Sequence, residues 1–353
     1  MAADTNVTRR ALRRLTGRSR PAPPWVVAEP EPDEPAPIAD AKLFAIIGAW
    51  MEEDVIAATV TNAFTQGCER VYLVDNDSTD DTCREAEAAG ATVAEVFATD
   101  EYDEKLRLDI MNRVVRDVSA AEPTDHVWWL WLDADEFPHA AGGETIRRRL
   151  DRLDRRFRIV GARFINHFPD RMPAYISGFH PLDFQPLCEE HRMGCRLKHR
   201  KHPLQRWDRN GPPIVCDRGF HRATSDERPL HEPSDAIYLH HFPYRDPDVT
   251  RRRLARLCGT DESAATRVRA NDDAADGMVP RFQTLDAVYR QDWANVRNYR
   301  ADGAFTTPHP IPWRELAGPG DAEPERWYTP AELDAAIRAT GATSEPATEH
   351  EPS

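Results

Sequence analysis

The sequence predicts an α/β protein in which a mostly parallel sheet is flanked by helices. Between residues 41 and 135, short apolar runs alternate with segments that carry helical spacing. The apolar runs are hydrophobic on both faces, as in strands that helices cover on both sides of a sheet. Consecutive runs end about 25 to 35 residues apart, which is the spacing of strand–helix–strand units.

The elements predicted in this first half follow a regular order. Buried strands are expected at 43–47, 71–74, 93–97 and 127–132, and helices at 53–66, 78–89 and 103–118. Ser78 is a suitable N-terminal cap for the second helix, and Gly90 is a residue type that commonly ends helices. Each helix would connect two parallel strands.

The second half is less regular. We expect a helix at 143–155, a strand at 158–165, a loop-rich stretch at 166–245, and helices at 249–258, 281–298 and 329–340. The last helix begins with a capping box, Thr329-Pro330-Ala331-Glu332, with proline at the first helical position. The loop-rich stretch has many His, Arg, Pro and aromatic residues, a composition that suits substrate binding.

These elements predict a domain with extensions at both ends. The domain is expected over 41–260, with a ligand-binding half at 41–140 and a second, acceptor half at 141–260, followed by a helical extension at 261–340. Residues 1–40 are basic and then rich in proline and acids, and residues 341–353 are also polar. Both segments are expected to be disordered, because their composition cannot bury enough apolar surface to fold.

Charge and composition limit the classes of function. The net charge of -14 argues against broad nucleic-acid binding. A phosphorylated small molecule is still allowed, because a metal ion can supply local positive charge. The six cysteines show no C-x-x-C spacing and are interpreted as reduced thiols, with a Cys188–Cys195 bridge as the alternative.

Targeting signals are not evident in the sequence. There is no apolar stretch typical of a signal peptide, and no apolar run approaches the roughly 18 residues that cross a bilayer. A cytoplasmic protein without a transmembrane segment is therefore expected. The basic residues 1–20 could contact an anionic membrane surface or simply be solvated.

Two acidic clusters follow predicted strands at their carboxyl ends, where open parallel sheets bind ligands. The first runs from Asp75 to Asp81, and the second is Asp133-Ala134-Asp135-Glu136. Two carboxylates in a D-x-D pattern can bind Mg²⁺ or Mn²⁺ together with phosphate oxygens. Acids in these places could instead cap the following helices. The strand of Val, Trp and Leu before Asp133 favours a metal site.

The two clusters, in this order, resemble the motifs of family 2 glycosyltransferases, which have the GT-A (Rossmann-like) fold. The resemblance covers about residues 44 to 253 and is greatest to a branch with a D-x-D-E-F motif. The matching segments are Trp50-Met51-Glu52-Glu53, Val74 to Asp80, Trp129 to Phe137, and Tyr238 to Arg245.

The resemblance implies a role for each matching acid. Asp75 would contact the base or ribose of a nucleotide-sugar, with Asp77 in the same cluster and Glu53 near the same base. Asp135 would ligate a metal that bridges the diphosphate. Asp133 would hold the ribose or take part in the metal site, for example through the water shell.

Histidines and basic residues supply further candidates. Many enzymes of this fold use a histidine from the second half as a metal ligand, and His221 and then His240 are the candidates here. Lys105 and Arg107, which open a predicted helix, could reach the donor phosphates or form a solvated helix face. The basic segment 198–202 could likewise bind phosphates or an anionic acceptor, or be a solvated loop.

An inverting glycosyltransferase needs a base that deprotonates the acceptor hydroxyl. The resemblance places this base beyond the D-x-D strand, where Asp183, Glu189 and Glu190 are candidates. Glu136 lies nearer the metal and could orient the acceptor instead. The sequence lacks the Glu-Asp pair and the Gln/Arg-x-x-Arg-Trp motif of commoner members, and residues 204–207 are only faintly similar. The spacing does not choose a base.

The sequence is therefore interpreted as a metal-dependent, inverting glycosyltransferase that uses Mn²⁺ or Mg²⁺. The donor would be a nucleotide-sugar, with a UDP-sugar as the first candidate. The acceptor would be a carbohydrate, a lipid-linked molecule or a small molecule.

Three alternatives were weighed. A sugar-1-phosphate nucleotidyltransferase would need a glycine-rich loop after the first strand, where the chain has only Gly48. A phosphatase with a nucleophilic Asp would carry its motif after the first strand. A binding module that had lost catalysis would not be expected to keep both D-x-D acids.

Overall fold

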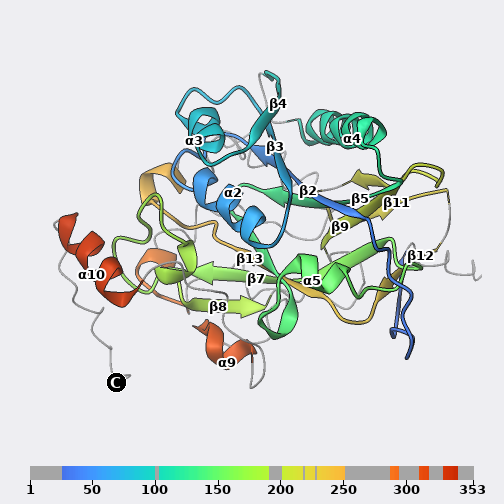
Figure 1. The fold of residues 1–353 in the computed structure, drawn as a ribbon. Coiled ribbons are helices and arrows are strands. Elements are labelled where there is room, and N and C mark those ends of the chain that lie inside the picture. The colour runs from blue at the N-terminus through green and yellow to red at the C-terminus, as the bar shows by residue number, and fades with distance from the viewer. Residues whose placement is uncertain are drawn as a thin grey trace, which may run out of the picture.

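The fold is α/β, with one central sheet flanked by helices, as the computed structural model shows (Figure 1). The structure describes residues 26–99, 103–190, 201–217, 219–226, 229–250, 287–293, 310–317 and 329–340. Among these residues, ten strands belong to the central sheet. Its main path runs β14 (Ile311–Pro312), β8 (Leu187–Glu190), β7 (Ile159–Phe168), β9 (Lys201–Asp208), β5 (His126–Asp133), β2 (Lys42–Ala49), β3 (Arg70–Asp75) and β4 (Thr92–Val96). The fold class expected from the sequence is confirmed.

Four strands form the parallel part of the sheet, in the order β4-β3-β2-β5. The connecting helices are α2 (Ile56–Thr65), α3 (Thr82–Ala88) and α4 (Glu104–Ala121). All seven elements were predicted to within a few residues, although α3 begins after Asp81 rather than at Ser78. The chain moves outward from β2 to β4 and then returns to the other side of β2. The boundary between β2 and β5 is therefore the switch point at which open α/β sheets bind ligands.

The rest of the sheet is mostly antiparallel. β5 pairs antiparallel with β9, β9 with β7, and β7 with β8. β13 (Ile237–His241) lies parallel to β7 and antiparallel to β6 (Glu136–His139). β10 (Val215–Asp217) and β11 (Arg222–Thr224) form a separate small sheet.

The stretch at 166–245, expected to be loop-rich, has long loops, and it contributes strands to this sheet that the sequence did not indicate. These strands bury many polar side chains that pair with one another, so the sequence shows no apolar run. Buried polar groups of this kind are tolerated because they are hydrogen-bonded.

The leader also differs from the expectation. β1 (Val26–Glu29) pairs with β12 (Leu230–Pro233), and the backbone N–H of Ala36 donates to Asp154 at 2.8 Å. Residues 26–40 thus pack along the domain through backbone pairing, which a composition argument does not detect. Residues 1–25 and 341–353 lie outside the described residues, as do most of 249–258 and 281–298, so the domain boundaries stay a prediction.

The remaining helical elements are short except for the last. They are α5 (Ile146–Leu150), η1 (Ala141–Gly143), η2 (Pro181–Asp183), α9 (Trp313–Ala317) and α10 (Pro330–Ala339). The predicted capping box is present at Thr329 and Glu332. α5 is shorter than the helix expected at 143–155. Among the described residues, no helix has the length and apolar character to cross a membrane, and Cys68, Cys83, Cys188 and Cys216 are free thiols.

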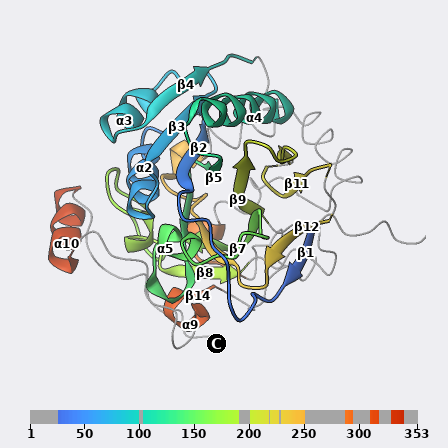
Figure 2. The ribbon, with the colours of Figure 1, turned by 45° about the vertical axis from the view of Figure 1, so that its right-hand side comes forward.

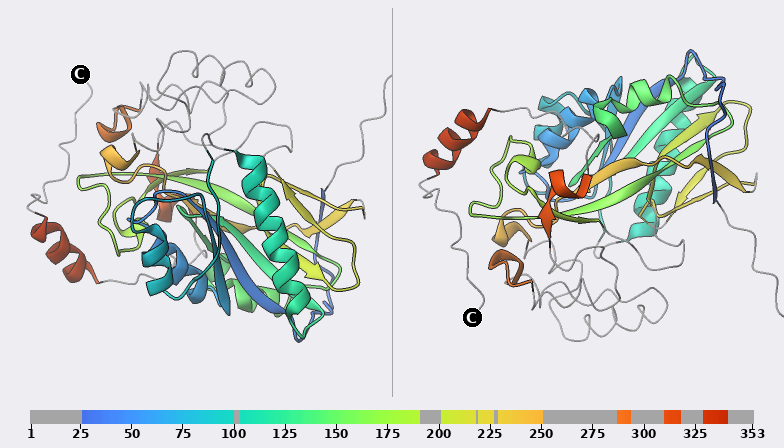
Figure 3. Two further views of the ribbon diagram at one scale, coloured as in Figure 1. Left: turned by 90° about the horizontal axis from the view of Figure 1, so that it is seen from above. Right: turned by 90° about the horizontal axis from the view of Figure 1, so that it is seen from below.

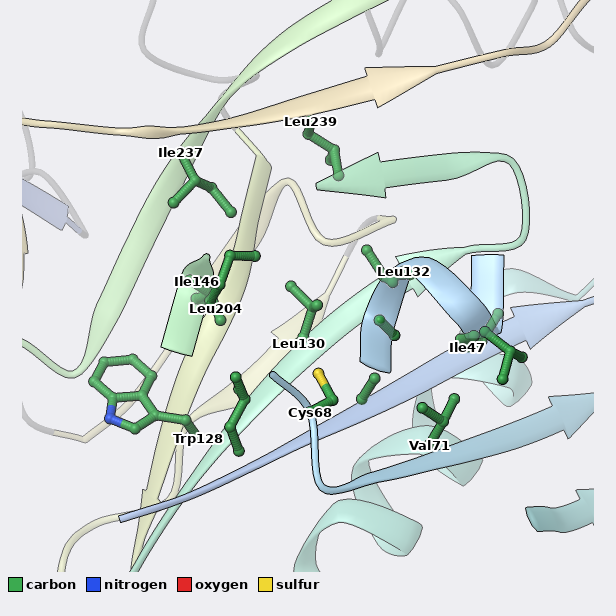
Figure 4. Close-up of a cluster of buried hydrophobic side chains, with 14 of the residues drawn as sticks. Ile47, Cys68, Val71, Trp128, Leu130, Leu132, Ile146, Leu204, Ile237 and Leu239 are labelled. Atoms are coloured by element: carbon green, nitrogen blue, oxygen red, sulfur yellow. The ribbon is translucent and has the colours of Figure 1, made fainter. Parts of the chain in front are cut away.

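Two hydrophobic clusters hold the helices against opposite faces of the parallel strands. One contains Leu43, Ala45 and Ile47 of β2 with residues of α2, α3 and α5. The other contains Phe44 and Ile46 with residues of α4. Figures 2 and 3 show α4 on one side of the sheet and α2 and α5 on the other. Figure 4 shows the first cluster, which also includes Leu130 and Leu132 of β5 and residues of β9 and β13.

Candidate active site

The two predicted acidic clusters meet at the carboxyl edge of the parallel strands. Asp75 is the register partner of Ala49, and Asp133 is the register partner of Gly48. The two acids therefore end the strands on either side of β2, as the predicted topology requires. The D-x-D loop is tied to the helix layer, because the hydroxyl of Thr59 in α2 donates to the carbonyl of Ala134.

Asp133 is held between two cations. Arg107 donates to one carboxylate oxygen at 2.8 Å and Lys201 donates to the other at 2.9 Å. Burial by itself would raise the pKa of Asp133, but the charges of Lys201 and then Arg107 lower it below its usual value. Asp133 is therefore an oriented carboxylate whose side chain keeps 28% exposure.

Gly48 explains how Arg107 reaches Asp133 from α4. A Cβ atom at Gly48 would lie 2.7 Å from Nη1 of Arg107, closer than such atoms approach one another. Any larger residue at this position of β2 would displace the guanidinium from where it binds Asp133. The single glycine after the first strand thus makes room for an arginine.

Lys201 also contacts Glu136, which is fully buried. Burial raises the pKa of Glu136 to about 8, although Lys201 opposes this shift. Burial would lower the pKa of Lys201, yet Asp133 and Glu136 together raise it above its usual value. Lys201 is the first residue of β9, and sequence reasoning placed it in a basic segment without recognising its partners. Residues 198–200 of that segment lie outside the described residues.

Asp135 lies beside two other positive or potentially positive groups. Nε2 of His241 is 3.6 Å and Nη1 of Arg245 is 3.7 Å from its Oδ2. Arg245 is 1% exposed and also binds Asp54 at 2.7 Å and Glu52. Burial would lower the pKa of Arg245, but Asp54 and Glu52 raise it well above its usual value. Arg245 therefore joins the loop after β2 to the D-x-D loop.

His241, and not His240, is the histidine that faces Asp135. Successive residues of a strand point to opposite faces of a sheet. Nε2 of His240 lies 2.8 Å from Nε2 of His139, and Nδ1 of His240 lies 2.7 Å from Nε2 of His167. Both ring nitrogens of His240 are thus engaged by other histidines. The sequence motif contained both residues, but only the register of β13 shows which one reaches the acids.

Asp75 anchors the loop that follows β3. Its two carboxylate oxygens accept hydrogen bonds from the hydroxyl of Ser78 at 2.6 Å and from the Ser78 backbone N–H at 2.7 Å. The same hydroxyl accepts from the backbone N–H of Met51 at 2.8 Å. Glu53 accepts from the backbone N–H of Asp81 at 3.0 Å. The loops after β2 and β3 are therefore linked to each other, and Asp77 is exposed in left-handed backbone with φ 52°.

The other predicted residues lie as follows. Lys105 is exposed and pairs with Asp109 on the outer face of α4. His221 is half-buried in a turn after Gly219, on the side where Glu104 begins α4. Asp183 is buried in η2, next to Phe184 of the cluster that packs around Phe137.

Two candidate bases lie on neighbouring positions of β8. Glu190 is bound by Arg163 through two hydrogen bonds of 2.9 and 2.8 Å. Glu189 is the register partner of Asn166 in β7, and Asn166 is the register partner of His241. Register partners share a face of a sheet, so Glu189 lies on the same face as His241.

A divalent ion fits Asp135 and His241. Such ions take oxygen ligands at about 2.1 Å, so two ligands of one ion lie no more than about 4.2 Å apart, and the 3.6 Å separation meets this condition. Within the described ranges, no group of three or more His, Cys, Asp or Glu side chains is arranged to hold a metal. Asp135 and His241 are thus a pair that could ligate such an ion, with phosphate oxygens or water among the other ligands.

Comparisons with known proteins identify no family. No protein-family model matches the chain, and no curated protein matches it. Among solved structures, glucosyl-3-phosphoglycerate synthase from Mycobacterium tuberculosis with Mn²⁺, UDP and glucosyl-3-phosphoglycerate is 17% identical with a TM-score of 0.25, over 36% of this chain and 45% of that chain. The structure of the same enzyme with Mg²⁺ and UDP is 17% identical with a TM-score of 0.25, over 39% of this chain and 50% of that chain. The structure of a mycobacterial protein is 19% identical with a TM-score of 0.25, over 36% of this chain and 42% of that chain.

The matches span half or less of those chains. Similarity this limited does not assign an activity. The sheet topology and the geometry of the acids described above are the basis for a functional proposal.

Proposed function

We propose that the chain is a metal-dependent, inverting glycosyltransferase of the GT-A type that moves a sugar from a nucleotide-sugar to an acceptor hydroxyl. The observation that supports this is the meeting of Asp75, Asp133 and Asp135 at the switch-point edge of the sheet, with His241 beside Asp135. Ligands of open α/β sheets bind at this edge. Oxygen and imidazole ligands there suit Mn²⁺ or Mg²⁺ with a diphosphate.

In this proposal Asp135 and His241 hold the metal ion. When bound, the ion would neutralise the charge that develops on the departing diphosphate. Asp133, kept ionised and oriented by Arg107 and Lys201, would accept hydrogen bonds from the ribose. Asp75 would hold the loop around the base, because Ser78 already binds both of its oxygens.

The acceptor base is proposed to be Glu189. Glu190 is the next residue of β8, so its side chain points to the opposite face of the sheet from Glu189. Glu189 lies on the face of the sheet that carries His241, so it is on the correct side to take a proton from an acceptor hydroxyl.

A thermal-shift screen with nucleoside diphosphates, with and without Mn²⁺, tests the proposal. We expect UDP with Mn²⁺ to raise the Tm of the wild-type chain, and Asp135→Ala to remove the metal-dependent part of the shift while the protein still unfolds cooperatively. Glu189→Gln should keep the shift and lose transfer, measured as Mn²⁺-dependent UDP release from UDP-sugars with a panel of carbohydrate, lipid-linked and small-molecule acceptors. A wild-type chain with no Mn²⁺-dependent shift for any nucleoside diphosphate would refute the proposal.

A further inference from the structure

His241 has a defined environment on each side of its ring. Nδ1 lies 2.7 Å from Oδ1 of Asn166, which is 4% exposed in β7. Nε2 lies 3.6 Å from Oδ2 of Asp135. The ring of Phe164 packs against the imidazole with ring centroids 4.9 Å apart. The orientation of the imidazole is therefore set by residues of the neighbouring strand.

The contact with Asn166 fixes the tautomer. An amide oxygen can only accept a hydrogen bond, so Nδ1 of His241 must carry the proton. The neutral ring then has its lone pair on Nε2, which faces the carboxylate of Asp135. The carboxylate of Asp135 facing Nε2 calls for a positive charge between the two groups, which either a proton on Nε2 or a metal ion supplies, and a metal ion would be ligated by both.

We propose that Asn166 is a positioning residue for the metal. It holds His241 in the tautomer and rotation in which Nε2 and Asp135 are offered to one divalent cation. Outer partners of this kind commonly fix the tautomer of a metal-binding histidine, and their loss typically costs 10- to 100-fold in metal affinity. This inference rests on the proposed function, because it takes Asp135 and His241 as the metal ligands.

Substitutions at Asn166 separate positioning from packing. Asn166→Leu keeps the approximate volume and removes the acceptor, whereas Asn166→Asp keeps an acceptor. In a Mn²⁺ titration in the presence of UDP, followed by thermal shift, we expect Asn166→Leu to weaken Mn²⁺ about 10- to 100-fold and Asn166→Asp to bind within a few-fold of wild type. The ¹⁵N NMR signals of the His241 ring should show the Nδ1–H tautomer in wild type and Asn166→Asp, and a mixture in Asn166→Leu.

Asn62→Leu is the matched control. Asn62 is also a buried asparagine, 5% exposed, and its amide donates to the carbonyl of Pro138 at 3.2 Å. The Asn62→Leu variant should be less stable than wild type and should keep the wild-type affinity for Mn²⁺. If wild type binds Mn²⁺ with UDP and Asn166→Leu binds it equally well, the positioning role is overturned while the proposed function stands. If Asn166→Leu does not fold, loss of Mn²⁺ binding in a folded Asn166→Asp variant overturns the positioning role. A wild type that binds no Mn²⁺ overturns both.

Discussion

The two faces of β13 carry adjacent histidines in very different surroundings. On one face, His241 lies between Asn166 and Asp135, and Arg245 lies beside the same carboxylate of Asp135. On the other face, His240 is 2% exposed among aromatic rings and joins His139 to His167. The rings of Trp313 and His240 meet at 4.6 Å, nearly perpendicular. One face is polar and carries the proposed metal ligands, and the other is closed and packed.

Burial disfavours the protonated form of the histidines on the closed face. Burial lowers the pKa of His167 to about 3 and that of His240 well below its usual value. Nδ1 of His139 donates to the carbonyl of Ala140, and Nδ1 of His167 donates to the carbonyl of Gln185. The ring nitrogens of these histidines therefore contact other groups within the protein, either backbone carbonyls or one another. The same residue type is packed among other rings on one side of the strand and faces a carboxylate on the other.

The largest expected difference between the faces concerns metal binding. His241→Ala removes one of the two protein ligands, so it should abolish the Mn²⁺-dependent thermal shift measured with UDP. Without the imidazole, the carboxylate of Asp135 would be the one remaining proposed protein ligand of the ion, which is too few to hold it. The measurement is the same titration used for Asp135→Ala.

His240→Ala is the control from the other face. It should lower the free energy of unfolding by about 2 to 4 kcal/mol, because it leaves a cavity and two buried ring nitrogens without their partner. The Mn²⁺-dependent shift should persist. Loss of the shift in His240→Ala, together with its survival in His241→Ala, would reverse the assignment of the two faces.

A second prediction concerns pH and the closed face. His180 is 5% exposed and packs on Phe137, with ring centroids 4.7 Å apart, and on Phe242. Burial, with smaller effects of His167 and His139, lowers the pKa of His180 to about 3. The unfolded chain would bind a proton near pH 6.5. Stability from this residue is therefore present above pH 6.5 and is lost as the pH falls toward 3.

His180→Asn isolates this contribution. Nδ1 of His180 accepts from the backbone N–H of Leu182 at 3.1 Å, and an asparagine oxygen can replace that acceptor without titrating. Well below pH 6.5, the free energy of unfolding of wild type should fall by about 1.4 kcal/mol per pH unit more than that of the variant. Urea unfolding at pH 7.5, 6 and 5 measures this. Equal slopes would mean that His180 binds its proton at the same pH in the folded and the unfolded chain, so that burial does not lower its pKa.

The parallel half of the sheet and its acidic edge were readable from the sequence. Strands such as β5 are apolar on both faces, so their ends could be located, and the βαβ order then brought Asp75 and Asp133 to one edge. Contacts of these acids with residues far along the chain could not be predicted from the sequence. Lys201 lies 68 residues after Asp133, and its role appears only when β9 pairs with β5.

The choice between His240 and His241 shows the same limit more sharply. Both residues belong to one recognised segment, and a one-residue change in strand register exchanges their faces. The register of β13 is set by its pairing with β6 and β7, which local sequence does not encode. The individual strands within 166–245 were not predicted for a related reason, since they bury paired polar residues.

The smallest expected effect is at Lys105, where α4 repeats the contrast between faces. Lys105 and Arg107 are two residues apart, about 200° around a helix. Arg107 is 8% exposed and passes Gly48 of β2 to reach Asp133, whereas Lys105 pairs with Asp109 on the exposed face. Exposed pairs of this kind contribute little to stability.

Lys105→Ala should therefore leave both the Tm and the UDP–Mn²⁺ shift unchanged, while Arg107→Ala should reduce that shift because Asp133 loses one of its two cations. Both variants are compared in one thermal-shift series. Equal losses of the shift in the two variants would mean that the donor phosphates extend to the outer face of α4. In that case the face on which a side chain lies would not determine whether it takes part in ligand binding. The different roles assigned to His240 and His241, which rest on the same reasoning, would then have to be reconsidered.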